Sequence, residues 1–377
     1  MREKNKINII TVFGTRPDAI KMAPVCHALE ADPAFNSKIL VTAQHRHMLD
    51  QVLEIFKLHS NFDLNIMEES QTLFHITRET LHKMEKILLQ EKPDLVLVHG
   101  DTTTAFAAAL SAFYLHIPVG HVEAGLRSFD MDNPYPEEAN RVLTDAITTL
   151  HFAPTHVAAQ NLAAHKARHA HIFITGNTVI DALLSVVKRP YNLNRLPINI
   201  NPKEFLYGRK LILMTAHRRE NFGEPIKQIC SAVKAIAREF PDVHIVYPVH
   251  LNPCIKKPVY RYLNSQKNIS LIPPVDYEAF AQLIKLSYFV VTDSGGIQEE
   301  APSLGKPVLV LRKVTERPEA VKAGTVRIIG TNEQAVYTSI KTLLTNRRQY
   351  IKMSKAINPY GDGKASMRIL QAIKCNV

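Results

Sequence analysis

The segment from Pro93 to Ser128 places the strongest constraint on the fold of this chain. It contains an apolar run at Leu95–Val98, an Ala-rich stretch at Ala105–Leu115 and a second apolar run at Ile117–Val122. Short apolar runs predict buried strands, and the Ala-rich stretch favours a helix. A strand, a helix and a second strand in this order form a right-handed crossover with parallel strands. The segment therefore predicts an α/β protein.

Asp101 and Glu123 follow the ends of these two strands. Ligands of open α/β sheets bind at the carboxyl edge of the strands, so carboxylates at this edge are well placed for chemistry. The alternative is that Asp101 caps the following helix and Glu123 is a loop charge, because Asp is a favoured N-cap residue. The segment alone leaves both interpretations open.

The same alternation of strands and helices extends over the rest of the chain. Strand-like Ile7–Phe13 begins a doubly wound pattern that ends near His171–Thr175. A stretch rich in Pro and Asn, Arg189–Pro202, is typical of an interdomain connection, and the pattern restarts at Lys210–Thr215.

Two Rossmann-like domains that face a cleft are therefore expected, which suits a length of 377 residues. We assign residues 1–176 to the first domain and residues 177–362 to the second. The amphipathic stretch Ala365–Lys374 predicts a C-terminal helix, within about residues 363–377, that packs back on the first domain.

The composition argues against membrane, secreted and metal-binding classes. The longest apolar run is broken by polar residues and Pro118, so no membrane span is predicted, and the first residues lack the pattern of a signal peptide. We expect a soluble cytoplasmic enzyme. The cysteines lack the spacing of a disulfide framework or a zinc site; they are Cys26, Cys230, Cys254 and Cys375.

The formal net charge of +11 indicates an anionic partner or a solvated basic surface. Apart from Arg2–Lys6 and Lys166–His171, the basic residues are spread along the chain, and no nucleic-acid-binding motif accompanies them. A small anionic substrate is therefore favoured over nucleic acid.

Two glycine-containing turns follow predicted strands. In the first, Gly14 allows a tight turn before a helix whose start carries Arg16 and Lys21. In the second, Ser294, Gly295 and Gly296 precede a helix that carries Glu300, which can accept hydrogen bonds from a ribose. Helix starts of this kind bind anions, although each is also compatible with an ordinary helix start. Neither is a G-x-G-x-x-G or Walker sequence, so NAD and an ATP γ-phosphate are not implied.

The two turns together favour a nucleotide diphosphate that bridges the domains. Arg317 and the loop Thr215–Asn221 add further cations. A single histidine such as His217 is more often structural, but it follows a strand end beside Arg218 and Arg219.

The sequence resembles the non-hydrolysing UDP-N-acetylglucosamine (UDP-GlcNAc) 2-epimerases. The matching stretches run in order along most of the chain: Gly14-Thr-Arg-Pro, Thr42-Ala-Gln-His-Arg, His99-Gly-Asp-Thr-Thr-Thr, His121-Val-Glu-Ala-Gly-Leu-Arg-Ser, Pro136-Glu-Glu-Ala-Asn-Arg, Gly176-Asn-Thr-Val-Ile-Asp, Thr215-Ala-His-Arg-Arg-Glu-Asn and Asp293-Ser-Gly-Gly-Ile-Gln-Glu-Glu-Ala-Pro-Ser-Leu-Gly. The resemblance implies a GT-B-like fold, a homodimer, and interconversion of UDP-GlcNAc with UDP-N-acetylmannosamine (UDP-ManNAc) without cofactor or metal.

The resemblance also implies roles for particular residues. Its catalytic residues map onto Asp101, Glu123, Glu137 and His217. Its substrate-binding residues map onto Arg16, Lys21, Phe280, Ser294, Gly295, Gly296, Glu300 and Arg317. A second UDP-GlcNAc, an allosteric activator in the family, would be held by Gln44, Glu137, Arg218 and His250, with His47 in the same pocket.

Three positions depart from the family pattern. Asp18 replaces a Glu, Lys313-Val314 replaces Asp-Thr, and His47 stands where relatives commonly have Glu or Gln. A neutral imidazole at position 47 offers the activator one hydrogen-bond acceptor, and a protonated imidazole offers none. We therefore expect activation by the second UDP-GlcNAc to weaken as the pH falls through about 6 to 7, where an ordinary histidine titrates.

Four functions are compatible with these features. Besides the non-hydrolysing epimerase, they are a hydrolysing epimerase or a 2-epimerase of a diacetamido-uronate, a nucleotide-sugar sensor, and a glycosyltransferase. The carboxylates argue against a sensor, and only the fold supports a glycosyltransferase.

Overall fold

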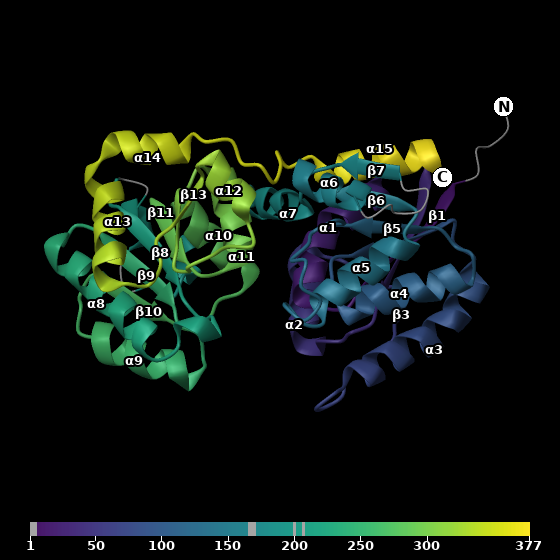
Figure 1. The fold of residues 1–377 in the computed structure, drawn as a ribbon, viewed down its shortest axis with the longest axis horizontal. Helices are drawn as coiled ribbons and strands as arrows, with labels where there is room; N and C mark the ends of the chain where they lie inside the picture. Colours follow the sequence, from purple (N-terminus) through teal and green to yellow (C-terminus); the bar gives the residue numbers. More distant parts are fainter. Residues whose placement is uncertain (1–5, 165–170, 199–200, 206–207) are drawn as a thin grey trace. The chain divides into compact units, whose positions relative to one another are not determined.

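The computed structural model describes residues 6–164, 171–198, 201–205 and 208–377. The chain divides into two compact units, one formed by Met1–Ser185 with Tyr360–Val377 and the other by Val186–Pro359. Each unit is built on a parallel sheet flanked by helices (Figure 1). The predicted α/β class with two Rossmann-like domains is confirmed.

The first unit contains a seven-stranded sheet in the order β3-β2-β1-β4-β5-β6-β7. Its central strands are buried apolar runs because helices cover the sheet. The strands are β1 (Ile7–Phe13), β2 (Phe35–Val41), β3 (Phe62–Asp63), β4 (Leu95–His99), β5 (Val119–Val122), β6 (Leu150–Ala153) and β7 (His171–Ile174). The helices are α1 (Arg16–Ala31), α2 (Arg46–Phe56), α3 (Leu73–Glu91), α4 (Thr103–Tyr114), α5 (Glu137–Ile147), α6 (His156–Ala164), α7 (Thr178–Val187) and α15 (Ala365–Asn376).

The second unit repeats this architecture with a six-stranded sheet in the order β10-β9-β8-β11-β12-β13. The strands are β8 (Leu211–Thr215), β9 (His244–Pro248), β10 (Ile269–Ile272), β11 (Phe289–Thr292), β12 (Val308–Val310) and β13 (Val326–Ile328). The helices are α8 (Glu224–Glu239), α9 (Pro253–Leu263), α10 (Tyr277–Leu286), α11 (Gly295–Glu300), α12 (Pro318–Ala323), α13 (Glu333–Thr345) and α14 (Arg347–Ser354).

The strand order reverses once in each sheet. The reversal lies between β1 and β4 in the first sheet and between β8 and β11 in the second. Loops that leave neighbouring strands at such a point run in opposite directions and open a crevice at the carboxyl edge, which is where doubly wound proteins bind ligands. The Gly14 and Asp101 turns follow β1 and β4, and the His217 and Ser294 turns follow β8 and β11.

The C-terminal helix α15, yellow in Figure 1, packs on α1 in the first unit. Its start is held by Asp181 of α7, whose carboxylate accepts hydrogen bonds from the backbone N–H groups of Ala365 and Ser366, at 3.1 and 2.9 Å. Because α7 is tied to α15 in this way, the compact units divide after Ser185, whereas the sequence assignment ended the first domain at residue 176.

Some elements lack a sequence signal. The patterns do not predict β3, α5, α9 or the elements between β12 and α15; α9, for example, contains Pro258 in its interior. The helix predicted after Gly296 is short: α11 ends at Glu300 and a 3-10 turn, Ala301–Leu304, follows, because Pro302 lacks a backbone donor. Apart from Lys6 and His171, the basic stretches Arg2–Lys6 and Lys166–His171 lie outside the described residues.

Candidate active site

Gly14 allows three loops of the first unit to meet closely. A Cβ at this position would lie 2.1 Å from Thr42 Oγ1 and 2.7 Å from Thr104 Oγ1, which is closer than real Cβ contacts. Only glycine therefore fits here. The turn leads into α1, which carries Arg16 and Lys21 in its first two turns at the carboxyl edge of the sheet.

Glu123, directly after β5, is the most strongly held carboxylate at this edge. It forms an ion pair with Lys21 and accepts a hydrogen bond from Asn177 Nδ2 at 3.2 Å. Its φ of 67° lies in the left-handed region, which is strained for a residue with a side chain such as glutamate. Burial opposes ionisation, but Lys21 and His99 outweigh it and hold the pKa of Glu123 well below its ordinary value.

His99 at the end of β4 lies between two carboxylates. Its Nδ1 is 3.4 Å from Asp18 Oδ1, and its Nε2 is 3.3 Å from Glu123 Oε2 without the alignment of a hydrogen bond. Burial disfavours the imidazolium, but the two carboxylates outweigh burial and raise the pKa of His99. Asp18, one of the departures from the family pattern, thus belongs to a row of ionisable side chains that runs through His99 to Glu123.

Asp101 does not cap α4; that alternative is wrong. The cap is Thr102, whose hydroxyl accepts a hydrogen bond from the backbone N–H of Ala105 at 3.2 Å. The Asp101 carboxylate is instead bound by Arg141 Nη2 at 2.5 Å, and Asn140 Nδ2 donates to its backbone carbonyl at 2.9 Å. Helix α5 therefore orients Asp101 at the carboxyl edge of the sheet.

The other predicted residues of the first unit differ in their contacts. Glu137 begins α5, and its Oε2 is buried and accepts no hydrogen bond from any residue that the structure describes. Gln44 accepts a hydrogen bond from the hydroxyl of Thr104 at 2.9 Å. His47, in the first turn of α2, is exposed, and no hydrogen bond or ion pair joins its side chain to another described residue.

In the second unit, a buried carboxylate organises the loop after β8. Asp293 Oδ2 accepts hydrogen bonds from the backbone N–H groups of His217 and Arg218, at 2.7 and 2.8 Å, and from Asn221 Nδ2 at 2.9 Å. Arg218 Nε also donates to the Asp293 carbonyl oxygen at 3.0 Å. Asp293 thus joins the β8 loop to the turn after β11.

The His217 imidazole stacks on a second histidine. Its ring centroid is 5.7 Å from that of His250, with 19° between the ring planes, and its Nδ1 is 3.3 Å from Asp293 Oδ1. Burial lowers the pKa of His217, and its neighbours His250 and Arg218 act in the same direction, whereas Asp293 opposes them. The lowered pKa favours the neutral imidazole, which can accept a proton.

Two guanidinium groups flank the glycine turn after β11. A Cβ on Gly295 would lie 3.7 Å from Arg218 Nη2 and 3.9 Å from Arg317 Nη2. Arg317 is fixed by an ion pair with the buried Glu299. Backbone N–H groups and two cations thus converge at one helix start, which is an arrangement suited to a phosphate or diphosphate.

Glu300 ends α11 and is largely buried. One oxygen accepts a hydrogen bond from the Tyr277 hydroxyl at 3.0 Å, and burial beside this carboxylate raises the pKa of Tyr277 well above its ordinary value. Phe280, one turn further along α10 from Tyr277, is partly buried. A fixed carboxylate beside an aromatic side chain is suited to the ribose and base of a nucleotide.

Comparison with known proteins decides the family. The family model described as UDP-N-acetylglucosamine 2-epimerase matches residues 27–374. The chain belongs to this family. A UDP-N-acetylglucosamine 2-epimerase of Escherichia coli K12 is 53% identical over 372 residues, which cover 98% of this chain and 99% of the relative. The Bacillus subtilis enzyme of the same name is 51% identical, with coverage of 98% and 95%.

A solved structure shows the same similarity. The Neisseria meningitidis UDP-GlcNAc 2-epimerase, bound to UDP-GlcNAc, is 47% identical and matches with a TM-score of 0.85, covering 98% of this chain and 100% of that chain. The resemblance of this chain to the UDP-N-acetylglucosamine 2-epimerases is thus confirmed.

Several residues that hold the candidate site residues in place have no role that the sequence predicts. These residues are Asp18, His99, Arg141, Asn177, Asp293 and Glu299. Most lie inside the stretches that carry the family resemblance, so the signal was present, but their partners are distant in sequence.

Within the described ranges, no helix combines the length and apolar character that a membrane crossing requires.

Proposed function

We propose that the chain interconverts UDP-GlcNAc and UDP-ManNAc by eliminating UDP and adding it back, without net hydrolysis. The observation that supports this proposal best is the position of two carboxylates, Asp101 and Glu123, at the carboxyl edge of the first sheet, where Arg141 and Lys21 hold them. The names of the relatives support the substrate.

The chemistry of the sugar explains why carboxylates are needed. The C2 proton is next to no carbonyl group, so its direct removal is unfavourable. When the C1–O bond breaks, its electron pair leaves with UDP, and a carboxylate removes the C2 proton as the C1–C2 double bond forms. The bound products are UDP and 2-acetamidoglucal. Re-addition of UDP to C1 with protonation of the other face of C2 gives the epimer.

We assign the carboxylates by their surroundings. Asp101 and Glu123 each form an ion pair, with Arg141 and Lys21 respectively, and carboxylates held in this way suit proton acceptance. Glu137 carries a buried oxygen without a hydrogen bond from the described residues, which suits a proton donor or a contact with a sugar hydroxyl. The imidazole of His217 is the fourth proposed catalytic group.

The second unit supplies the UDP side. The Ser294, Gly295 and Gly296 backbone, with Arg317, binds the diphosphate and stabilises the charge that develops on it. Glu300 accepts from the ribose, and Phe280 packs on the nucleoside. From the first unit, Arg16 and Lys21 contribute positive charge.

Regulation is part of the same proposal. A second UDP-GlcNAc binds through Gln44, His47, Arg218 and His250 and favours the catalytically competent state, which gives sigmoidal rates. The protein acts as a cytoplasmic homodimer that supplies a sugar nucleotide for polysaccharide biosynthesis.

Turnover in deuterated water tests the mechanism. The protein is incubated with UDP-GlcNAc and no acceptor, and the sugar nucleotides are resolved by chromatography and mass spectrometry. Both epimers should carry one deuterium at C2. Epimer without deuterium contradicts elimination, accumulation of free sugar indicates a hydrolysing enzyme, and unchanged substrate indicates a sensor or another sugar nucleotide.

A further inference from the structure

A cavity of about 700 Å³ lies in the second unit, away from the carboxyl edge of its sheet. Lys210 precedes β8, Tyr288 precedes β11 and Lys306 lies just before β12, and all three line the cavity. They mark the amino edge of the sheet, whereas the His217 and Ser294 turns lie at the opposite edge. The volume falls within the range of about 300 to 1,000 Å³ that is usual for small-molecule sites.

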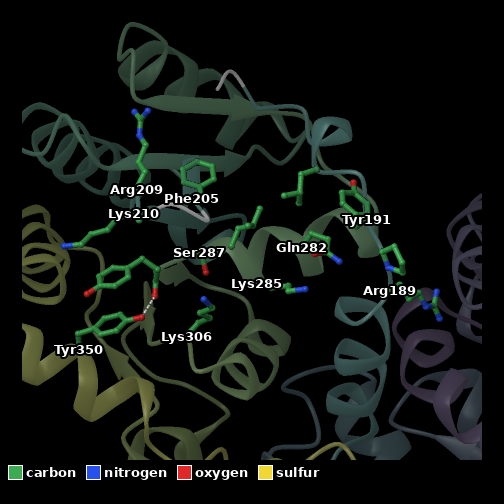
Figure 2. A pocket seen from close by; sticks show the side chains of 15 residues that line it. Arg189, Tyr191, Phe205, Arg209, Lys210, Gln282, Lys285, Ser287, Lys306 and Tyr350 are labelled. Atoms are coloured by element: carbon green, nitrogen blue, oxygen red, sulfur yellow. Dashed lines mark hydrogen bonds between the residues drawn. The ribbon is translucent and has the colours of Figure 1, made fainter. Parts of the chain in front are cut away.

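The described lining of this cavity contains five cationic side chains and no carboxylate (Figure 2). Arg209 pairs with Glu204 at 2.6 Å, Lys210 Nζ donates to a backbone carbonyl at 3.1 Å, and Lys285 Nζ does so at 2.8 Å. Arg189, which also has a partner, and Lys306 complete the set. Positive charge therefore accumulates around a concave surface, which favours an anion.

Two lining groups have hydrogen-bond donors that the described residues leave unused. Lys306 is partly buried, its side-chain ammonium forms no hydrogen bond or ion pair with a described residue, and burial lowers its pKa. Gln282 is only 3% exposed, and its Nε2 donates no hydrogen bond within the described part of the chain. An unpaired buried donor costs free energy, which an acceptor in the cavity would recover.

The rest of the lining is largely apolar and aromatic. Tyr288 and Tyr350 stack with ring centroids 4.0 Å apart and 4° between the ring planes, and Phe205 and Leu193 add apolar surface. Figure 2 shows Tyr350 and Lys306 on one side of the view and Gln282 and Tyr191 on the other. Such a lining suits an organic molecule better than a bare inorganic ion.

We propose that this cavity binds a small organic phosphate with an aromatic or apolar body. Its phosphoryl oxygens accept hydrogen bonds from Lys306 and Gln282, and its organic part packs on the aromatic lining. The site is separate from the one proposed for UDP-GlcNAc, because it lies at the other edge of the second sheet.

Calorimetric titration of the full chain with 1-naphthyl phosphate tests this site. We expect a saturable event that Lys306→Met weakens about tenfold to a hundredfold, because a charge-assisted hydrogen bond is lost. Gln282→Leu should weaken the same event, and it should fold well because it removes an unpaired buried donor. Lys322→Met, at an exposed lysine of α12, is the matched control and should bind like the wild type.

Several outcomes would overturn the proposal. Equal titration curves for wild type, Lys306→Met and Gln282→Leu would show that the cavity does not bind the probe. Equal affinity for neutral 1-naphthalenemethanol would show that the cavity does not recognise the phosphate group. Equal affinity for inorganic phosphate would show that it does not recognise the organic part. Epimerase turnover of Lys306→Met should match that of the wild type whatever the probe does, so this test is independent of the proposed activity.

Discussion

Lys21 and Glu123 form a buried ion pair that joins the second turn of α1 to the end of β5. The side chains are only 15% and 7% exposed, so solvent screens the pair weakly. The pair links the stability of the first unit to the ionisation of a proposed catalytic group.

Lys21→Met should lower the free energy of unfolding at pH 7 by about 3 kcal/mol, because it leaves a buried carboxylate without its cation. The pKa of Glu123 is lowered in the folded state, so its stabilisation is present above the ordinary value of 4.5 and is lost as the pH falls below it. Urea unfolding at several pH values should therefore show the difference between variant and wild type shrinking below about pH 4.5.

Lys38→Met is the matched control for this experiment. Lys38 pairs with Glu91, but its side chain is 33% exposed, so the loss should stay below about 1 kcal/mol. An equal loss of unfolding free energy in Lys21→Met and Lys38→Met would contradict a special role for the ion pair of Lys21.

Asp101→Asn should lower epimerase turnover by roughly two to four orders of magnitude while the fold is retained, because the amide cannot accept the proton. Glu123→Gln should behave similarly. Turnover is measured by chromatography of the sugar nucleotides, and circular dichroism checks the fold. Glu85→Gln, at an exposed position of α3, provides the control. A change below about threefold in a folded variant would remove that carboxylate from the mechanism.

Gly14→Ala should destabilise the protein by about 1 to 3 kcal/mol, since the new Cβ would overlap the hydroxyls of Thr42 and Thr104. Denaturant unfolding measures the loss. Unchanged stability would show that the loops around Gly14 shift at little cost.

Gly295→Ala should keep the stability of the protein but weaken its binding of UDP. Its Cβ meets only ordinary contacts, and alanine favours a helix over glycine, so stability should be kept or slightly raised. The methyl group would occupy the space beside the Arg218 and Arg317 guanidinium groups, however, and affinity for UDP should fall about tenfold or more. Calorimetric titration with UDP tests this, and wild-type affinity would place the diphosphate elsewhere.

His47→Gln should remove the pH dependence of activation, because glutamine keeps an acceptor at every pH. The initial rate from UDP-ManNAc is compared with and without a trace of UDP-GlcNAc at pH values between about 6 and 8. An activation ratio that is flat with pH in the wild type would show that His47 is only a surface residue.

The sequence by itself determined the fold class and the family of the protein, and it placed polar residues at the carboxyl ends of predicted strands. Apolar runs such as Leu95–Val98 predict buried strands because burial and backbone hydrogen bonding act locally. Polar residues after such runs, including Asp101 and Glu123, must then reach the carboxyl edge whatever the rest of the chain does. The family resemblance was readable for the same reason, since its motifs are short and continuous.

Only the tertiary structure decided which groups pair with one another. Arg141 binds Asp101 from 40 positions further along the chain, and Arg218 binds Asp293 from 75 positions away. No local pattern encodes such partners, because they depend on strand order and on helix packing. The cavity beside Lys306 was unpredictable for the same reason: its lining comes from segments that only the folded sheet brings together.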